Sequence, residues 1–283
     1  MNTFNIINKL QNNKWMMERK SLYSFYNTID NLANIRMGGL KGLIMGESPI
    51  VKMQDDFISK ITPENSDTNN VGILYISGVL TKGASLMEQE LLGLTDIDDI
   101  SKSLDEYAVD PSIDSIILCF SSPGGETTGI AELGRKIKYI DENVKPVFSW
   151  TETMCCSAAY WLGSQARTIG MTETSQLGSI GVYMIILNAE EKYKQEGIEV
   201  QAISSGKYKM MGHDHESLKS DEKDLLQADV ESQHQKFKDV IKSKRPQAKD
   251  EAMEGISYEG PKALELGLVD LVVEDFDEFL SKV

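Results

Sequence analysis

The stretch TMCCSAAYW, residues 153–161, joins a short apolar segment to a helical one. Residues 146–150 predict a buried strand, and residues 158–166 predict the first turns of a helix. Ser157 therefore stands at a strand-to-helix turn, where the helix N-terminus behind it offers free N–H groups and partial positive charge. Such N–H groups can stabilise an oxyanion. Ser157 is either a nucleophile or a helix cap, a role in which serine is common.

The segments around this turn alternate between strand and helix patterns. Strands are expected at residues 71–76, 115–120, 146–150, 180–186, 198–203 and 268–273. Helices are expected at 96–107, 130–140, 158–166, 190–194, 220–244 and 261–266. This alternation predicts an α/β fold with parallel strands and right-handed crossovers. The helix at 220–244 has a narrow apolar stripe that packs either on its own sheet or on a neighbouring subunit, made of Leu226, Val230, Phe237 and Ile241.

A second turn of the same kind precedes Ser157 in the chain. The segment Ser122-Pro123-Gly124-Gly125 ends the apolar run at 115–120. Glycines there let the backbone approach a ligand closely and point N–H groups toward it. Because adjacent parallel strands end at the same edge of a sheet, both turns are expected at that edge, where α/β proteins bind ligands. An ordinary strand-to-helix turn is the alternative interpretation.

A serine nucleophile needs a base, and the sequence offers two kinds. The histidines are His213, His215 and His234. His213 and His215 flank an aspartate, but this pattern lacks a further ligand, and we expect no metal. The other kind of base is a buried lysine, which becomes neutral near physiological pH. Lys207 and Lys209 lie within SGKYKMMG, residues 205–212, with a solvated surface charge as the alternative for each.

Composition limits the class of protein. The chain has 283 residues, a formal net charge of −15 and a pI of about 4.7. No basic patch offsets this charge, which argues against nucleic acid or an anionic membrane as partner. Three cysteines, two of them adjacent, predict no disulfide framework and favour a reducing environment. No apolar run has the length of a membrane helix, and residues 1–19 lack the core of a secretory signal, so a cytoplasmic location is expected.

Residues 1–65 differ in character from the rest of the chain. Residues 15–17 and 22–26 predict a helix with an apolar face, and residues 37–43 are punctuated by glycine. Residues 63–70 have the composition of a polar linker. We expect an N-terminal extension over residues 1–65, either docked on a neighbouring subunit or partly disordered, followed by one large domain over residues 66–283.

Five motifs in sequence order resemble the signal peptide peptidase A (protease IV) family of serine peptidases. They are SPGG at 122–125, CSAAYW at 156–161, GSIGV at 178–182, SGKYKMMG at 205–212 and YEGPKALELGLVD at 258–270. The resemblance implies a crotonase-like (Clp protease-like) fold and a serine endopeptidase with a Ser-Lys dyad. The roles of the family then fall on Ser157 as nucleophile, Lys209 as neutral base, Ser179 as the residue that orients the lysine, and the backbone of Gly124 or Gly125 and of Ala158 as oxyanion donors.

The sequence departs from the family pattern at several places. Cys155 and Cys156 replace small residues, Ala158-Ala159 replaces Gly-Gly, and the membrane anchor of the bacterial enzymes is missing. A form without this anchor resembles the phage head-maturation (prohead) proteases, which cleave scaffold and capsid proteins. The resemblance therefore implies polypeptide substrates, a homo-oligomeric ring, no cofactor, no nucleic acid or membrane partner, and a location in the host cytoplasm or the prohead interior.

Three alternatives stay open. The first is a cytoplasmic signal-peptide-degrading peptidase of the same family. The second is a crotonase-type acyl-CoA enzyme, which shares the fold and the two-amide oxyanion hole but needs an acidic residue that no motif here supplies. The third is a catalytically inactive, ring-forming assembly protein, against which the set Ser157, Ser179 and Lys209 argues. Cys155 is the next candidate nucleophile if Ser157 is not the one.

Overall fold

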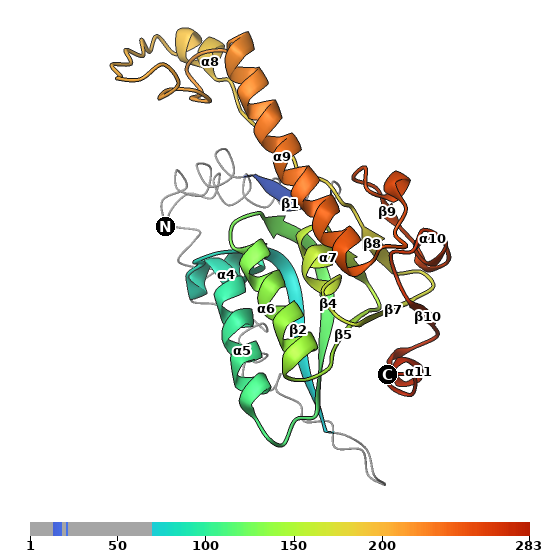
Figure 1. Cartoon of the computed structure of the whole chain (residues 1–283). Helices are drawn as coiled ribbons and strands as arrows, with labels where there is room; N and C mark the ends of the chain where they lie inside the picture. The colour runs from blue at the N-terminus through green and yellow to red at the C-terminus, as the bar shows by residue number, and fades with distance from the viewer. Residues whose placement is uncertain (1–13, 19–20, 22–69) are drawn as a thin grey trace.

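The computed structural model describes residues 14–18, 21 and 70–283, and these form an α/β structure around one sheet (Figure 1). The strands are β1 (Trp15–Met17), β2 (Val71–Thr81), β3 (Leu94–Asp96), β4 (Ser115–Glu126), β5 (Val147–Thr151), β6 (Met154–Cys156), β7 (Thr168–Thr172), β8 (Gln176–Gly178), β9 (Ser257–Tyr258) and β10 (Leu271–Val273). The α-helices are α4 (Leu86–Leu92), α5 (Ile97–Val109), α6 (Ile130–Asn143), α7 (Ala158–Gly163), α8 (Glu190–Gln195), α9 (Ser220–Lys244), α10 (Gly260–Glu265) and α11 (Phe276–Leu280).

The strand β4 explains why the sheet is covered on both faces. Its side chains alternate in direction, as they must in a strand. Ile116, Leu118 and Phe120 join the large apolar core beneath α5 and α6. Ile117 and Cys119 point to the other face and join a smaller core with Trp150 and Phe279 of α11. The prediction of a continuous apolar strand buried on both faces is confirmed.

The same strand also determines where the two turns meet. β2 and β5 pair with β4 in parallel, and β7 and β10 continue the sheet beyond β5. Near its C-terminal end β4 pairs with β6 through Ser122 and Cys155, and β6 pairs in parallel with β8. The strand β1 pairs antiparallel with this same end of β4. The SPGG segment and the Ser157 turn therefore lie together at this end of β4, as the sequence predicts. The prediction that SPGG is itself a turn is wrong, because residues 122–125 continue β4 as far as Glu126 and pair with β2 and β1.

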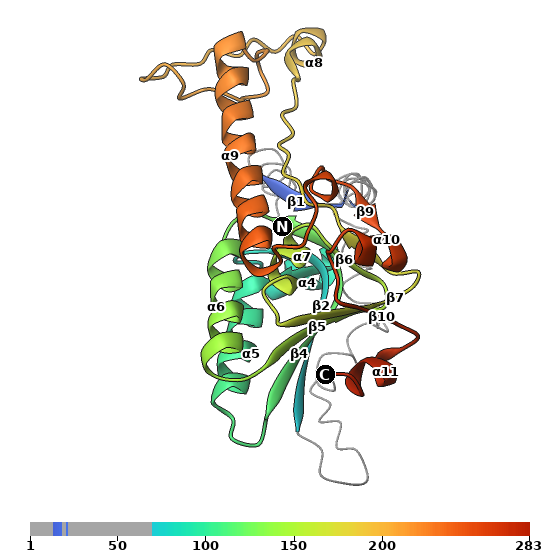
Figure 2. The same ribbon diagram turned by 45° about the vertical axis from the view of Figure 1, so that its right-hand side comes forward.

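The long helix α9 divides into two parts with different surroundings. In its C-terminal half Phe237 and Ile241 are buried, and the ring of Phe237 lies 4.9 Å from that of Trp161 in α7. Its N-terminal half extends away from the sheet and carries α8 and the loop 196–219 (Figures 1 and 2). We call residues 187–230 the projecting arm. Glu222 is the one buried residue of this fully described segment.

Two predicted strands are wrong. Residues 180–186 form irregular backbone with a single bridge at Tyr183, and residues 198–203 belong to the projecting arm and form no strand. Ile198, Val200 and Ile203 are exposed, Ile203 at 99%. A β-branched pattern predicts a strand only where a neighbouring strand accepts its hydrogen bonds, and within one chain no such neighbour reaches the arm.

The prediction of a helix over residues 15–17 is also wrong, because this segment forms β1 against β4. Three apolar residues carry no periodicity that separates helix from strand, and the partner decided the outcome. The predictions for residues 22–26 and 37–43, and the boundary at residue 65, lie outside the described residues. None of the described helices is both long and apolar enough to cross a membrane.

Candidate active site

Ser157 occupies a backbone conformation that L-residues rarely adopt. Its φ is 55° and its ψ is −118°, and it is completely buried. A non-glycine residue at positive φ costs of order 1–3 kcal/mol and persists only where its surroundings hold it, often at a functional site. Here the holding contact is the backbone N–H of Ser157, which donates to the carbonyl of Gly178 at 2.7 Å. A strained serine between a strand and a helix is also the arrangement of a nucleophile turn, although here the hydroxyl is buried.

The Ser157 hydroxyl does not cap the helix behind it. No side-chain capping hydrogen bond is made at the start of α7, and Oγ has no hydrogen-bond partner among the described residues. A buried hydroxyl without a partner costs free energy, so such a group calls for an explanation. The hydroxyl therefore does not act as a side-chain cap of α7.

Ser179 lies directly beside the Ser157 turn. The register of β6 and β8 pairs Cys156 with Gly178, so the residues that follow each strand are neighbours. Ser179 is 6% exposed and has a φ of 51°, and its N–H donates to the carbonyl of Ile256 at 2.8 Å. The two serines thus occupy adjacent, similarly strained turns.

The two glycines of the SPGG segment, in the last part of β4, have different surroundings. A Cβ on Gly124 would overlap the carbonyl oxygen of Met16 and lie 2.9 Å from the amide nitrogen of Ala158. A Cβ on Gly125 would instead overlap the carbonyl oxygen of Leu80 in β2. Gly124 is therefore the glycine that faces the start of α7, where the Ala158 N–H has no earlier helical carbonyl to bind. The Gly124 N–H makes a long hydrogen bond, 3.2 Å, to the Ser122 hydroxyl.

Lys209 is not brought to this edge by the fold of one chain. Its neighbours Lys207 and Tyr208 contact the carboxylate of Asp221, at 2.7 Å and 3.2 Å, in the first turn of α9. Asp221 precedes Phe237, which packs on α7, by a length of helix that corresponds to about 24 Å at 1.5 Å per residue. Lys209 is exposed. The expected burial of Lys209 beside its apolar neighbours is thus absent from the single chain.

Lys207 is the less suitable of the two lysines as a base. Its ammonium group donates to Asp221, and this hydrogen bond raises the pKa of Lys207, which keeps it protonated. His234 is also unsuitable, because its Nε2 faces the carbonyl oxygens of Ile180 and Met253 at 3.1 Å and 2.8 Å. Two acceptors require a proton on that nitrogen, so it donates rather than accepts.

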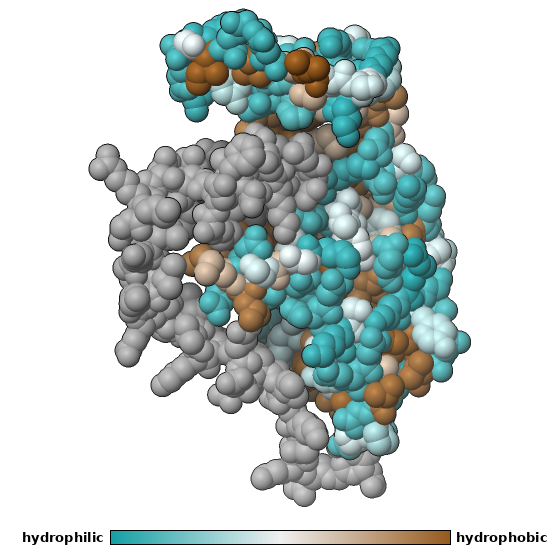
Figure 3. Space-filling view, turned by 90° about the vertical axis from the view of Figure 1, so that its left-hand side faces the viewer, coloured by the Kyte–Doolittle hydropathy of each residue, from teal (hydrophilic) through white to brown (hydrophobic). Residues whose placement is uncertain are grey.

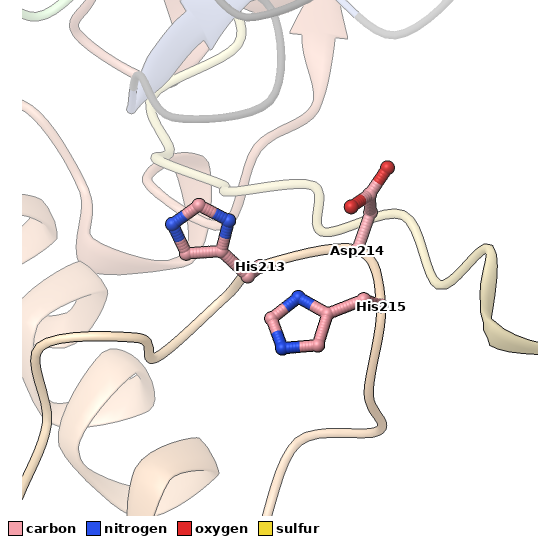
Figure 4. Close-up of side chains that lie close together, drawn as sticks. All are labelled: His213, Asp214 and His215. Atoms are coloured by element: carbon pink, nitrogen blue, oxygen red, sulfur yellow. The ribbon is translucent and has the colours of Figure 1, made fainter. Parts of the chain in front are cut away.

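The residues His213, Asp214 and His215 lie together on the projecting arm (Figure 4). Their potential ligand atoms lie within 4.8 Å of one another. One Asp214 oxygen accepts a hydrogen bond of 2.7 Å from the Tyr193 hydroxyl, and the Asp214 carbonyl accepts from the N–H of Ala189. These bonds fasten the loop to α8, which accounts for Asp214 without a metal.

The two cysteines before Ser157 are poor nucleophiles. Both are buried, and burial raises the pKa of Cys155 well above its usual value and that of Cys156 to about 12. Only the thiolate is reactive, so both thiols are inert near neutral pH. Cys155 therefore does not replace Ser157 as a candidate.

Residues 14–18 are the part of this site that sequence reasoning missed. They lie against Gly124 and next to Ala158, although the sequence places them more than a hundred residues earlier. Only the shortness of the apolar run Trp15–Met17, between Lys14 and Glu18, could have suggested a strand. Nothing in that pattern identifies β4 as the partner.

Residues 140–282 match the model of Peptidase family S49, just over half of the 283 residues, and the chain belongs to this family. The matched segment contains Ser157, Ser179 and Lys209, and Gly124 precedes it. The family resemblance inferred from the five motifs is confirmed.

Curated relatives include proteins of phages and of bacteria. Capsid assembly protease C of Escherichia phage lambda is 33% identical over 138 residues, which are 49% of this chain and 31% of that protein. The head-tail preconnector protein GP5 of Enterobacteria phage P21 is 30% identical over 138 residues, 49% of this chain and 27% of that protein. Protease 4 of Haemophilus influenzae is 24% identical over 155 residues, 53% of this chain and 24% of that protein. Each match covers less than a third of the relative's length.

Proposed function

We propose that this protein is a serine endopeptidase whose nucleophile is Ser157. The observation that carries the proposal is the buried, strained Ser157 whose hydroxyl has no partner at the N-terminus of α7. Attack of Oγ on a peptide carbonyl gives an acyl-enzyme, which water then hydrolyses. The amides of Ala158 and Gly124 stabilise the oxyanion. Gly125 is the weaker candidate, because its backbone packs against Leu80. The same proposal includes the crotonase-like (Clp protease-like) fold.

The base is Lys209 of a neighbouring copy of the chain. Within one chain the arm holds Lys209 far from Ser157, so this lysine reaches a Ser157 hydroxyl only on another copy. Docking of the arm would bury Lys209, and burial favours the neutral amine that a base needs. Ser179, in the turn next to Ser157, orients the incoming amine. Lys209 then takes the proton of Ser157 and returns it to the leaving amine.

The surface of the projecting arm supports this arrangement. It exposes apolar side chains in a segment that has almost no buried residue of its own (Figure 3). The exposed apolar residues of the arm include Leu187, Ile198, Val200, Ile203 and Tyr208. Such surface on a soluble chain marks a protein interface. Because the arm and the site that it serves are different surfaces, the contact is heterologous and closes into a ring.

The substrates are proposed to be polypeptides, and capsid or scaffold proteins of a phage are the favoured ones. This rests on the similarity to a phage capsid assembly protease, since the site itself selects no sequence. A location in the host cytoplasm or the prohead interior follows from the same similarity.

Labelling with a fluorophosphonate tests the proposal, because this reagent reacts with an activated serine hydroxyl. We expect one label per active site on the assembled wild-type chain, located at Ser157 by mass spectrometry, and none on Ser157→Ala. Ser121→Ala, which removes an exposed serine at the same edge, is the matched control and stays labelled. A label at another residue, or equal labelling of Ser157→Ala, rejects Ser157 as the nucleophile.

A further inference from the structure

The backbone of residues 14–18 binds the end of β4 as an added strand. Trp15, Met16 and Met17 pair antiparallel with Glu126, Gly125 and Gly124. The ladder continues on both sides, since Thr127 donates to the carbonyl of Lys14 at 3.1 Å and Glu18 donates to the carbonyl of Pro123 at 2.7 Å. The segment thus pairs with β4 from Pro123 to Thr127, which includes the two glycines of the candidate site.

The other side of the same segment is also bound. The N–H of Trp15 donates to the carbonyl of Tyr183 at 2.9 Å, and the N–H of Tyr183 donates to the carbonyl of Trp15 at 3.1 Å. Tyr183 belongs to the backbone that follows the Ser179 turn. The segment therefore lies between two backbone edges, one leading from Gly124 and one from Ser179, which is how an extended peptide is held by strand addition.

This position brings a peptide carbonyl close to the start of α7. The Met16 carbonyl oxygen and the Ala158 amide nitrogen both lie beside the Cα of Gly124, at the place where a side chain would otherwise sit. A substrate carbonyl must come close to this place if the amides of Ala158 and Gly124 are to stabilise its oxyanion. Residues 14–18 therefore cover the approach of an extended peptide to the proposed oxyanion donors.

The side chains of the segment enter apolar surroundings on alternate sides. Trp15 and Met17 are each 3% exposed and pack with Val79, Ala84, Leu92 and Leu94. Met16 is 1% exposed and points the other way, into the main core. The side chains give the strand its affinity, while the backbone gives its register. Outside these contacts, Lys14 pairs with Asp229 of α9 at 2.6 Å.

We propose that residues 14–18 occupy the substrate position of the peptidase, so that the chain is self-blocked until an extended polypeptide displaces them. This inference rests on the proposed function and names a regulator of the same site. The tethered strand competes as an intramolecular ligand, so a free peptide must compete with its effective concentration. A substrate wins only when it is itself held at high local concentration, as a co-assembled protein is, so free polypeptides in dilute solution are spared.

Peptide binding without catalysis tests the proposal. The full chain carrying Ser157→Ala is titrated with a fluorescent synthetic peptide of residues 12–20, and anisotropy gives the dissociation constant. Adding Trp15→Ala and Met17→Ala to this chain weakens its own strand, and we expect the peptide to bind about tenfold more tightly, because a larger fraction of the chain is open to it. Trp150→Ala is the matched control, since Trp150 is also 3% exposed but packs on the opposite face with α11. It leaves the affinity unchanged.

Hydrogen exchange provides a second measurement that needs no change in the strand. Saturating peptide on the Ser157→Ala chain is expected to accelerate exchange at the amides of residues 15–18 and to leave β2 protected. Unchanged exchange there, together with unchanged affinity in the Trp15→Ala/Met17→Ala chain, overturns the proposal and makes β1 a permanent structural strand. Neither readout requires hydrolysis, so failure of fluorophosphonate labelling would reject the peptidase function without affecting this result.

Discussion

The surroundings of Ser157 and those of Lys209 differ in almost every physical respect. Ser157 is buried, and the register of β4, β6 and β8 brings it together with Gly124, Ala158 and Ser179. Lys209 is exposed on an arm in which one residue of 187–230 is buried. The first region is completed by its own sheet, whereas the second has apolar surface and no core. The comparison supports the proposal that one chain supplies the nucleophile and that a neighbouring copy supplies the base.

The largest expected effect comes from Ser157→Ala. We expect kcat/KM for a peptide substrate to fall by roughly 10⁴ or more, because the nucleophile is lost. The melting temperature should not fall, since Oγ makes no hydrogen bond that the change could break. Activity assays and calorimetry on the same sample check both parts. Retained hydrolysis would place the chemistry elsewhere and would remove the basis of the comparison.

Mixing two inactive chains tests directly whether the two halves come from different copies. Ser157→Ala and Lys209→Ala are each expected to be inactive. Co-assembled in equal amounts, they should recover about a quarter of wild-type activity, because a site needs an intact serine from one chain and an intact lysine from its neighbour. Lys209→Arg should be as inactive as Lys209→Ala, since arginine stays charged.

The control for this experiment is Lys207→Ala, which lies two residues away and should keep its activity. If Lys207→Ala is inactive while Lys209→Ala is active, the base is Lys207 and the assignment to Lys209 is wrong. If the mixed chains never recover activity although each assembles, the base does not come from a neighbouring copy.

A smaller effect is expected from charge on the arm. Ile203 is 99% exposed, so Ile203→Glu should change the stability of the single chain by less than about 0.5 kcal/mol. Assembly should weaken, because a carboxylate would have to be buried at the contact. Analytical ultracentrifugation over a concentration series checks this. Val109→Glu, at a 79% exposed position at the end of α5 and outside the projecting arm, should assemble normally. Equal behaviour of the two variants would exclude this part of the arm from the interface.

The smallest effect on activity is expected at the C-terminal end of α9, where Lys244 and Arg167 both bind the carboxylate of Asp141, at 2.9 Å and 2.8 Å. Burial acts to raise the pKa of Asp141, but the hydrogen bonds from Arg167, the Val147 N–H and Lys244 outweigh it and lower the pKa below 3.8. The stabilisation is therefore present above pH 3.8 and is lost as the pH falls through the lowered value.

Asp141→Asn should lower the free energy of unfolding by about 1–3 kcal/mol at pH 6, which is the range for hydrogen bonds to charged groups. The difference from wild type should shrink below pH 3.8. Denaturant unfolding at pH 6 and at pH 3 measures it, with Glu106→Gln on the exposed face of α5 as the control. If Asp141→Asn lowers the free energy of unfolding by the same amount at pH 6 and at pH 3, the ion pairs of Asp141 do not contribute to stability.

Local patterns in the sequence were sufficient for the turn that carries Ser157, because an apolar run before it and a helical pattern after it required a strand, a turn and a helix. They were not sufficient for SPGG, which was expected to be a turn and continues β4. The parallel α/β rule still placed both segments at the same end of the sheet. The sequence pattern also predicted both ends of α9, because a capping region marks its start and a proline follows its end. The family followed from the order of the motifs.

The tertiary structure decided what depends on partners distant in the sequence. Residues 15–17 became a strand because β4 offered an unpaired edge, and residues 198–203 did not, because no edge reached them. The position of Lys209 was likewise beyond the sequence, since the direction in which α9 leaves the sheet follows from the packing of Phe237 on Trp161. The sequence determined residue types and local turns, which depend on short-range sterics and hydrogen bonds. Only the folded chain decided which of these residues meet, because long-range contact depends on sheet register and on the packing of distant side chains.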